Sequence, residues 1–407
     1  MKKILSISAI LLFISILSLK VTAQGCVAVR QMGGVFGVGS TNSYNLAKGD
    51  FQVGANYRYF HSWRHYVGTE EQPQRQNTGG GLGTDGKDRG NAVNIYSHAI
   101  DLNFSYGLTS RIQLYATIPY VHNERSQVLR QTTPVVDTFR YSVFAKGLGD
   151  IRVGGNYWIF DPAKAQKGNL NIGIGLKLPT GSHSKEDQAP QSNGTFRYTV
   201  MDQAIQPGDG GLGISLELQG FTHLYKGIYG FANGYYLFNP KESNGTFKSA
   251  PSVIKDANGN VLGTLTGYNV YACPDQYFAR AGFMTSVLKN NNLTFSLAFR
   301  IEGIPANDAL GGKVAYRRPG YVEAIESGIS YRTGQSSFSL FVPYNVVRNR
   351  IQSAADIASQ NLQNSVITDK SNYVHVQGDA AFADYSINFG YSYRIGAKIK
   401  APKFKAQ

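Results

Sequence analysis

The stretch that decides the fold reads HAIDLNFSYG over 98–107, LTS over 108–110 and RIQLYATIPY over 111–120. In the first run, apolar side chains at even positions from 100 to 106 alternate with polar side chains at odd positions. The third run repeats this alternation, and a short polar turn separates the two. Because side chains of a β-strand point to opposite faces in turn, the stretch predicts a hairpin of two amphipathic strands.

The same period-two alternation recurs along the chain. Clear runs occupy 169–178, 212–224, 293–302 and 384–394. Weaker runs occupy 51–60, 148–160, 228–238, 277–288, 321–332 and 337–344. The run 321–332 is ambiguous, because Glu323 and Glu326 fall on opposite faces of the expected strand. We predict an all-β fold of about 12 strands, within a range of about 10 to 14.

Short and long connections alternate between these strands. The short turns are predicted at 108–110, 161–168, 225–227, 289–292 and 333–336. The long loops are predicted at 61–97, 121–147, 179–211, 239–276, 303–320 and 345–381. Membrane barrels have tight periplasmic turns and long external loops, and about ten residues let a tilted strand cross a bilayer. We therefore predict a transmembrane antiparallel up-and-down β-barrel over 50–395, with both chain ends in the periplasm.

A soluble β-sandwich or propeller is the alternative, since both also contain short strands separated by turns. The regular strand length and the strict order of short and long connections favour the membrane barrel. The composition agrees, with 46 Gly, 26 Tyr and 22 Phe. Aromatic residues suit pleated surfaces, and glycine suits turns and close strand packing.

The N-terminus has the layout of a secretory signal peptide. Lys2 and Lys3 precede a mostly apolar run, and the small residues Val21-Thr22-Ala23 offer a cleavage site. We expect residues 1–23 to be removed on export, which places the mature chain in the cell envelope of a Gram-negative bacterium. With a barrel fold, the expected location is the outer membrane. A basic tail, 396–407, follows the last predicted strand.

The formal charge of +14 comes from scattered Lys and Arg rather than a dense basic run. We therefore expect no nucleic-acid binding, and expect outer-membrane lipid and small solutes as partners. The sequence contains no metal-protease, nucleophile-elbow or phosphate-loop motif, so we predict no catalytic residue, metal or cofactor. It does not indicate an oligomeric state.

The inward face of the predicted barrel carries charges of both signs. The candidate lumen-lining residues are Asp101, Arg111, Arg152, Lys177, Glu217, Arg300 and Glu302. Charges in a lumen can tune selectivity or can form a static salt-bridged lining. The mixture of signs argues against a strongly ion-selective pore.

Four short phrases, three of them rich in glycine, resemble a known family. They are GLGDIRVG at 147–154, GLKLPTG at 175–181, QPGDGG at 206–211 and PDQY at 274–277. These phrases resemble the outer-membrane barrels of the meta-pathway phenol-degradation transporter-like family, in a Bacteroidetes-type branch. The resemblance covers about residues 98 to 395. It implies passage of small, often aromatic, hydrophobic compounds, and it carries over no catalytic or ligand residue.

The leading hypothesis is a pore or transporter for small, hydrophobic or aromatic solutes. A second is a structural or adhesive barrel whose external loops bind a surface partner. A third is an outer-membrane lipid enzyme, for which His98, His122 and His223 near strand ends are the candidates. A nucleophile and base must meet in space for that chemistry, and spacing alone cannot place them together.

The two cysteines raise a question about the N-terminal segment. Export favours disulfides, yet Cys26 belongs to the periplasmic end and Cys273 to an external loop of the predicted barrel. A direct Cys26–Cys273 bond requires residues 24–49 to thread the lumen as a plug, which their length allows. The alternatives are two separate cysteines, or a lipidated Cys26.

Overall fold

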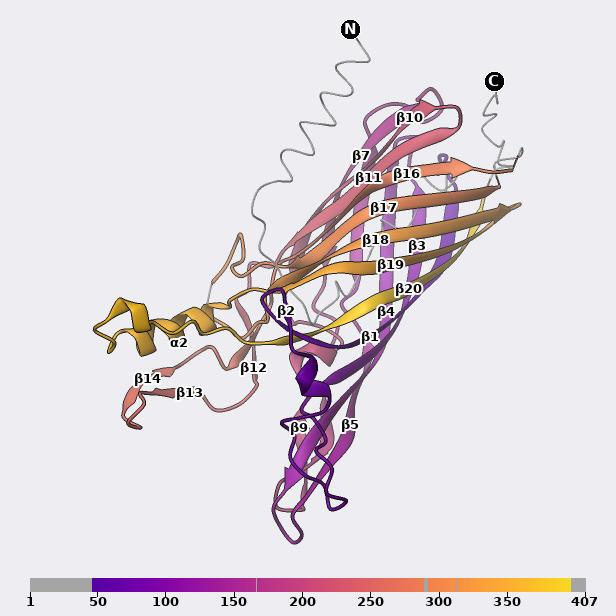
Figure 1. The fold of residues 1–407 in the computed structure, drawn as a ribbon. Helices are drawn as coiled ribbons and strands as arrows, with labels where there is room; N and C mark the ends of the chain where they lie inside the picture. Colours follow the sequence, from indigo (N-terminus) through magenta and orange to yellow (C-terminus); the bar gives the residue numbers. More distant parts are fainter. Residues whose placement is uncertain (1–45, 166, 289–291, 313, 397–407) are drawn as a thin grey trace.

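The computed structural model describes residues 46–165, 167–288, 292–312 and 314–396. Within these residues, twelve antiparallel strands form a closed barrel, in which β1 pairs with both β3 and β20 (Figure 1). The barrel strands are β1 (Phe51–Val67), β3 (Asn94–Gly107), β4 (Ile112–Gln131), β6 (Arg152–Trp158), β7 (Gly168–Lys177), β10 (Gly213–Tyr225), β11 (Ile228–Phe238), β16 (Gln276–Ser286), β17 (Leu293–Ile304), β18 (Gly320–Thr333), β19 (Ser336–Arg350) and β20 (Ala380–Ile395). The predicted fold class and strand number are confirmed.

The short connections gather at one end of the barrel, which we call the turn end. Lys226 and Gly227 alone connect β10 to β11, and both have positive φ angles, 35° and 81°. Such two-residue turns match the twist of the strands they join. Phe51 pairs with Ile395, so the barrel begins and ends there. The predicted alternation of turns and loops is confirmed, although most of the turn 289–292 lies outside the described residues.

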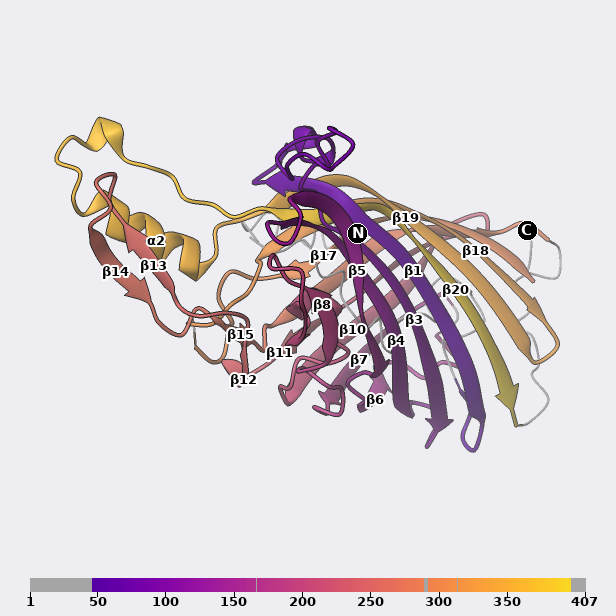
Figure 2. The ribbon, with the colours of Figure 1, turned by 90° about the horizontal axis from the view of Figure 1, so that it is seen from below.

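The opposite, loop end is more structured than the prediction of long loops. The prediction of a loop over 121–147 is wrong in part. Strand β4 continues beyond the barrel and pairs with β5 (Asp137–Leu148) from Tyr120 to Gln131. Further strand pairs are β8 (Glu186–Pro190) with β9 (Phe196–Val200), β12 (Ser243–Phe247) with β15 (Val270–Ala272), and β13 (Ser252–Lys255) with β14 (Val261–Leu265). The pair β13–β14 projects from the barrel beside one helix, whereas β8 lies against β5 (Figure 2).

That helix, α2 (Ala354–Asn364), lies in the predicted loop 345–381. Ser353 and Asp356 form a reciprocal capping box at its N-terminus, each side chain bonding the other residue's backbone N–H. Smaller elements are β2 (Glu70–Glu71), η2 (Pro73–Gln76), η3 (Gln203–Ile205) and η4 (Lys370–Asn372). No helix among the described residues is long and apolar enough to cross a membrane.

The two faces of the barrel wall differ in polarity. Outward side chains are apolar and uncovered: Leu102 is 45% exposed, Ile174 58% and Leu216 53%. Their inward neighbours in sequence include polar groups that are buried, such as Asp101 and Ser215. A broad exposed apolar band around a polar interior is the arrangement of a barrel surrounded by lipid.

Residues 46–50 lie against the turn end, where the N–H of Gly49 donates to the carbonyl of Gly107 and Leu46 is buried. The rest of the predicted plug, together with the signal peptide 1–23 and nearly all of the tail 396–407, lies outside the described residues. The plug therefore stays a prediction.

Candidate functional site in the barrel interior

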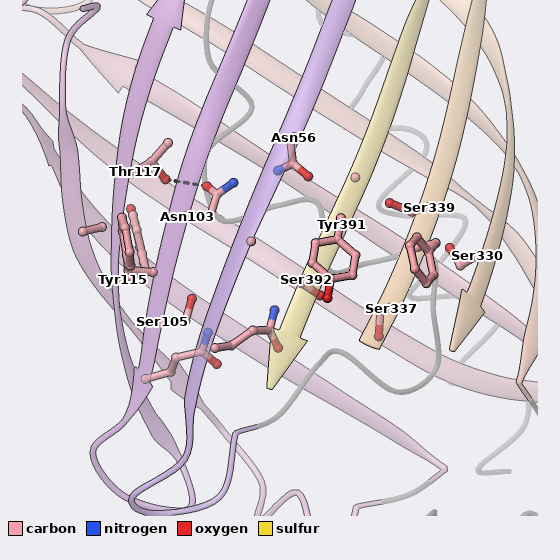
Figure 3. A pocket seen from close by; sticks show the side chains of 17 residues that line it. Asn56, Asn103, Ser105, Tyr115, Thr117, Ser330, Ser337, Ser339, Tyr391 and Ser392 are labelled. Carbon is pink, nitrogen blue, oxygen red and sulfur yellow. Dashed lines mark hydrogen bonds between the residues drawn. The ribbon is translucent and has the colours of Figure 1, made fainter. Parts of the chain in front are cut away.

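The turn half of the interior contains a cavity of about 100 Å³, which we call the chamber (Figure 3). Strands β1, β3, β4, β18, β19 and β20 form its wall. Its polar side chains are amides and hydroxyls: Gln52, Asn56, Asn103, Ser105, Gln113, Tyr115, Thr117, Ser330, Ser337, Ser339, Tyr391 and Ser392. The chamber wall therefore offers hydrogen-bond donors and acceptors without a carboxylate, ammonium or guanidinium group.

The sequence builds this wall by placing small polar residues at inward positions of adjacent strands. Asn103 and Thr117 face each other across β3 and β4, and the Thr117 hydroxyl donates to Asn103 Oδ1 at 2.9 Å. Gly54 and Gly390 keep the wall thin on the other side, where a Cβ on Gly54 would lie 2.8 Å from the carbonyl oxygen of Tyr391. The chamber is thus hollow beside Gly54 and Gly390, where the inward residues have no side chain.

Beyond the chamber, eight charged side chains form what we call the belt. Its members are Arg58, Asp101, Arg152, Glu217, Arg280, Arg300, Glu302 and Glu326. Among these eight residues, the positive charges of four arginines equal in number the negative charges of four carboxylates. Most of the belt is buried, and Arg300 and Glu326 are each only 1% exposed. Buried charges are tolerated when they are paired, and ion pairs join Arg280, Arg300, Glu302 and Glu326 within the belt.

Glu326 connects two arginines that would otherwise repel each other. Arg280 and Arg300 are directly opposite on β16 and β17. Glu326 on β18 accepts from Arg280 through Oε1 and from Arg300 through Oε2, the latter at 2.8 Å. Arg300 also donates to Glu302 at 2.8 Å. Charge-assisted bonds of this kind are about twice as strong as neutral ones.

Aromatic rings support the arginines. The guanidinium of Arg152 lies 4.8 Å from the ring centre of Tyr235, and that of Arg300 lies 4.9 Å from Phe278. Arg58 interacts electrostatically with Asp101 and Glu302. The rings provide a negative face for each flat cation, so the belt combines ion pairs with cation–π contacts.

Glu217 links the belt to the chamber. It accepts hydrogen bonds from the Tyr115 hydroxyl and, at 2.9 Å, from Ser215 Oγ. Tyr115 lines the chamber wall. A solute that reaches the inner end of the chamber therefore meets a hydroxyl whose orientation depends on a belt carboxylate.

The seven predicted lumen residues fall in three places. Five lie in the belt: Asp101, Arg152, Glu217, Arg300 and Glu302. Lys177 lies at the loop end. Arg111 lies at the turn end, where Nη1 is 3.4 Å from the Tyr157 hydroxyl, away from the belt. The prediction missed Arg58, Arg280 and Glu326, although each holds an inward position in its strand's alternation.

Lys177 belongs to a cluster at the mouth of the barrel. Its ammonium group contacts both carboxylate oxygens of Asp209 and lies 3.7 Å from Asp150. Asp150 accepts from the backbone N–H groups of Gly181 and Asp209 at 2.9 and 3.1 Å. Burial, with the nearby charge of Asp209, raises the pKa of Asp150 to about 6. The three glycine-rich phrases therefore meet at this cluster, and it fastens the loops between their strands.

Cys273 lies beside the same cluster and is 0% exposed. Its thiol donates to the backbone carbonyl of Asp209 at 3.1 Å, and burial raises its pKa to about 12. Cys26 lies outside the described residues, so the Cys26–Cys273 bond stays a prediction.

Two further ion pairs hold the loops at this end. Arg318 binds Asp202 through two bonds of 2.7 Å, and Arg317 binds Asp308 through two bonds of 2.6 Å. Burial alone would raise the pKa of Asp202, but the charge and hydrogen bonds of Arg318 hold it below its ordinary value. Bidentate pairing of this geometry fixes loop position as well as charge.

The three candidate histidines have aromatic partners. Tyr57 Oη lies 2.8 Å from His98 Nδ1, His122 packs edge-on against Phe144, and His223 packs against Tyr229. Within the described residues, no serine hydroxyl is hydrogen-bonded to any of the three, and no group of three or more His, Cys, Asp or Glu is placed to hold a metal.

Comparison with known proteins gives structural likeness only. The chain resembles an outer-membrane channel of Pseudomonas putida F1 at 10% identity and TM-score 0.49, over 87% of this chain and 98% of the channel. It resembles the toluene transporter TbuX of Ralstonia pickettii at 11% identity and TM-score 0.41, over 86% and 90%. It resembles a FadL homologue of Pseudomonas aeruginosa at 9% identity and TM-score 0.40, over 91% of this chain and 95% of the homologue.

No known protein family and no curated protein matches the sequence. The fold assignment rests on the strand pairing itself. The resemblance to the phenol-degradation family stays a prediction.

Proposed function

We propose that this protein is an outer-membrane channel that admits small uncharged solutes, including hydrophobic and aromatic ones. The observation that carries the proposal is the chamber, whose wall hydrogen-bonds without charge inside a barrel with an apolar outer face. The amide and hydroxyl groups of this wall can exchange hydrogen bonds with a neutral solute, and the wall has no charged side chain to attract an ion of one sign. The proposal includes export by the signal peptide 1–23 and passage of phenol-like compounds.

The belt supports a preference for uncharged solutes. Its four arginines and four carboxylates neutralise one another, so it presents no excess charge to attract one kind of ion. An ion passing the belt has to compete with pairs that are already made. A neutral solute meets no such competition, and selectivity for neutral molecules follows.

Liposome swelling tests this function. Purified protein in liposomes is exposed to neutral, anionic and cationic solutes of matched size. We expect neutral solutes to enter several-fold faster than charged ones. Asn56→Trp, inside the chamber, should slow entry of the neutral solutes. Ala55→Trp, on the outward face of the same strand, is the matched control and should leave entry unchanged.

Two results would remove the proposal. If no solute enters faster than in protein-free liposomes, the barrel has the structural or adhesive role. If Asn56→Trp and Ala55→Trp slow entry equally, the chamber is not on the path. Release of fatty acid from labelled phospholipid would instead favour the lipid-enzyme hypothesis.

A further inference from the structure

Strand β18 carries a carboxylate on each face. Glu326 points inward to the belt, whereas Glu323 is opposite Ile301 and faces outward, half-buried. A charged residue on the lipid face is disfavoured in the middle of a bilayer and tolerated near its surface. Glu323 is only three residues from the loop end of β18, at Gly320. Its outward position needs a partner that lipid tails alone do not provide.

The outer wall beside Glu323 is hollowed into a groove of about 1260 Å³, which we call the wall groove. Its lining residues belong to β4, β6, β7, β10, β11, β16, β17 and β18, and its surface is almost entirely apolar. Its floor consists of short residues that pair across β11 and β16, namely Ala232 with Ala281 and Gly234 with Ala279. Longer side chains form the two sides. They are Ile172, Ile174, Leu216, Leu218, Phe299 and Ile301. The wall groove is therefore a row of short side chains between two rows of longer ones.

The hydroxyl of Tyr277, on the outward face of β16, is a polar group of the wall groove without a hydrogen-bond partner among the described residues. Tyr277 is 8% exposed. The neighbouring Tyr236 differs, because its hydroxyl donates to Asp275 at 2.9 Å. A buried hydroxyl without a partner is costly, so Tyr277 indicates a ligand that accepts its hydrogen bond.

The shape and chemistry of the wall groove limit the occupant. A second copy of the chain would bring the same concave surface against this one in a two-fold dimer, which leaves the trough unfilled. A peptide segment would leave its backbone N–H and C=O groups unpaired against apolar walls. A slim hydrocarbon chain has no such groups and fits a trough with a floor of alanine and glycine.

We propose that the wall groove binds one phospholipid with a primary-amine headgroup. An acyl chain lies along the alanine and glycine floor. The Tyr277 hydroxyl donates to an ester carbonyl of the lipid, and the Glu323 carboxylate accepts from its ammonium group. This binding depends on membrane insertion and not on solute passage through the chamber.

Native mass spectrometry of the full-length protein in mild detergent tests the proposal, with added phosphatidylethanolamine or phosphatidylglycerol as probes. We expect one phosphatidylethanolamine to stay bound to the wild-type chain. The double variant Ala232→Leu/Ala281→Leu fills the floor and should abolish retention. Ala55→Leu, an outward alanine on β1 outside the wall groove, is the matched control and should keep the lipid.

Two single variants test the polar end. Tyr277→Phe removes the hydroxyl and should weaken retention by roughly 3- to 10-fold. Glu323→Gln should remove the preference for phosphatidylethanolamine over phosphatidylglycerol while keeping an acyl chain bound. Heat-dependent gel mobility checks that each variant has a closed barrel, and all four variants should retain wild-type solute entry.

Equal retention by the double variant and Ala55→Leu, with both barrels closed, overturns the site. A dimer that disappears in the double variant, without bound lipid, assigns the wall groove to a second copy and also overturns it. Equal retention of the two phospholipids by the wild type overturns the headgroup assignment. Loss of solute entry in Asn56→Trp bears only on the channel, because Asn56 lies inside the barrel and not on the wall groove.

Discussion

The turn end and the loop end of this barrel are stabilised by different interactions. At the turn end, connections as short as Lys226-Gly227 join neighbouring strands, and the interior on this side contains the uncharged chamber. At the loop end, buried ion pairs fasten long connections, and Arg318 and Asp202 are 116 residues apart. Turn geometry and side-chain alternation are local, so they determine the turn end. The loop end depends on partners that meet only after the barrel closes.

The belt lies between these two regions and gives the strongest test of the contrast. Glu326→Gln leaves Arg280 and Arg300 opposite each other without their shared carboxylate. Removing one partner of a buried ion pair costs about 3–5 kcal/mol, so we expect a loss of that size in the free energy of unfolding. Ser330→Ala, in the chamber wall of the same strand, should cost no more than about 1 kcal/mol. Urea unfolding of both variants in lipid vesicles measures the difference, and similar losses would mean that the belt is not a buried network.

A second substitution pair compares the two faces of the wall. Leu102→Arg puts a cation on the outward face and should cost about 2–4 kcal/mol near mid-membrane. Asn103→Arg, the next residue, enters the polar chamber and should cost less. The same urea series measures both. Equal costs would show that the chamber is as dry as the lipid face.

Gly175→Arg is not a suitable inward control for this comparison. Gly175 faces inward like Asn103, but a side chain there would collide with the Tyr115 hydroxyl and with Ser215. Arginine at 175 would therefore be destabilising through overlap rather than through charge.

The strands were predictable because the alternation of apolar and polar side chains is visible within the ten or so residues of one membrane-crossing strand. The ambiguity of 321–332 was also informative, since Glu323 and Glu326 do face opposite sides of the wall. Alternation does not reveal which inward charges meet. Arg280 and Glu326 are 46 residues apart and contact each other only through the register of β16, β17 and β18.

The loop end was less predictable for two reasons. In the part of β4 that pairs with β5, residues 122–127 are all polar, so the alternation of apolar and polar side chains fades there. Helix α2 did have a local signal, because Ser353 and Asp356 have the spacing of a capping box. The helix has a single buried residue, Ser359, so the sequence offers no apolar core face to indicate it.

The cluster of Lys177, Asp150 and Asp209 at the mouth of the barrel has a smaller, pH-dependent effect on stability. The pKa of Asp150 is raised to about 6, above about 3.9 in an unfolded chain. Between these pH values the folded protein binds more protons than the unfolded one, so this group's contribution to stability falls as pH rises from about 4 to 6. Asp150→Asn should flatten that part of the curve by on the order of 1 kcal/mol. Urea midpoints at pH 4.5 and 7 measure the change, and an unchanged slope would contradict the assignment to Asp150.

Asn258→Cys should have the smallest effect on the protein. It is also the most direct test of which end of the barrel faces outward. Asn258 is exposed in the turn between β13 and β14, at the loop end, where its N–H donates to Asp256. A cysteine there should leave stability unchanged within about 0.5 kcal/mol. It should react with a membrane-impermeant maleimide on intact cells. Cys273 is a built-in reference, since its buried thiol should stay unlabelled until the protein unfolds. Labelling at 258 only after lysis would place the loop end in the periplasm, and the chamber would then open to the outside.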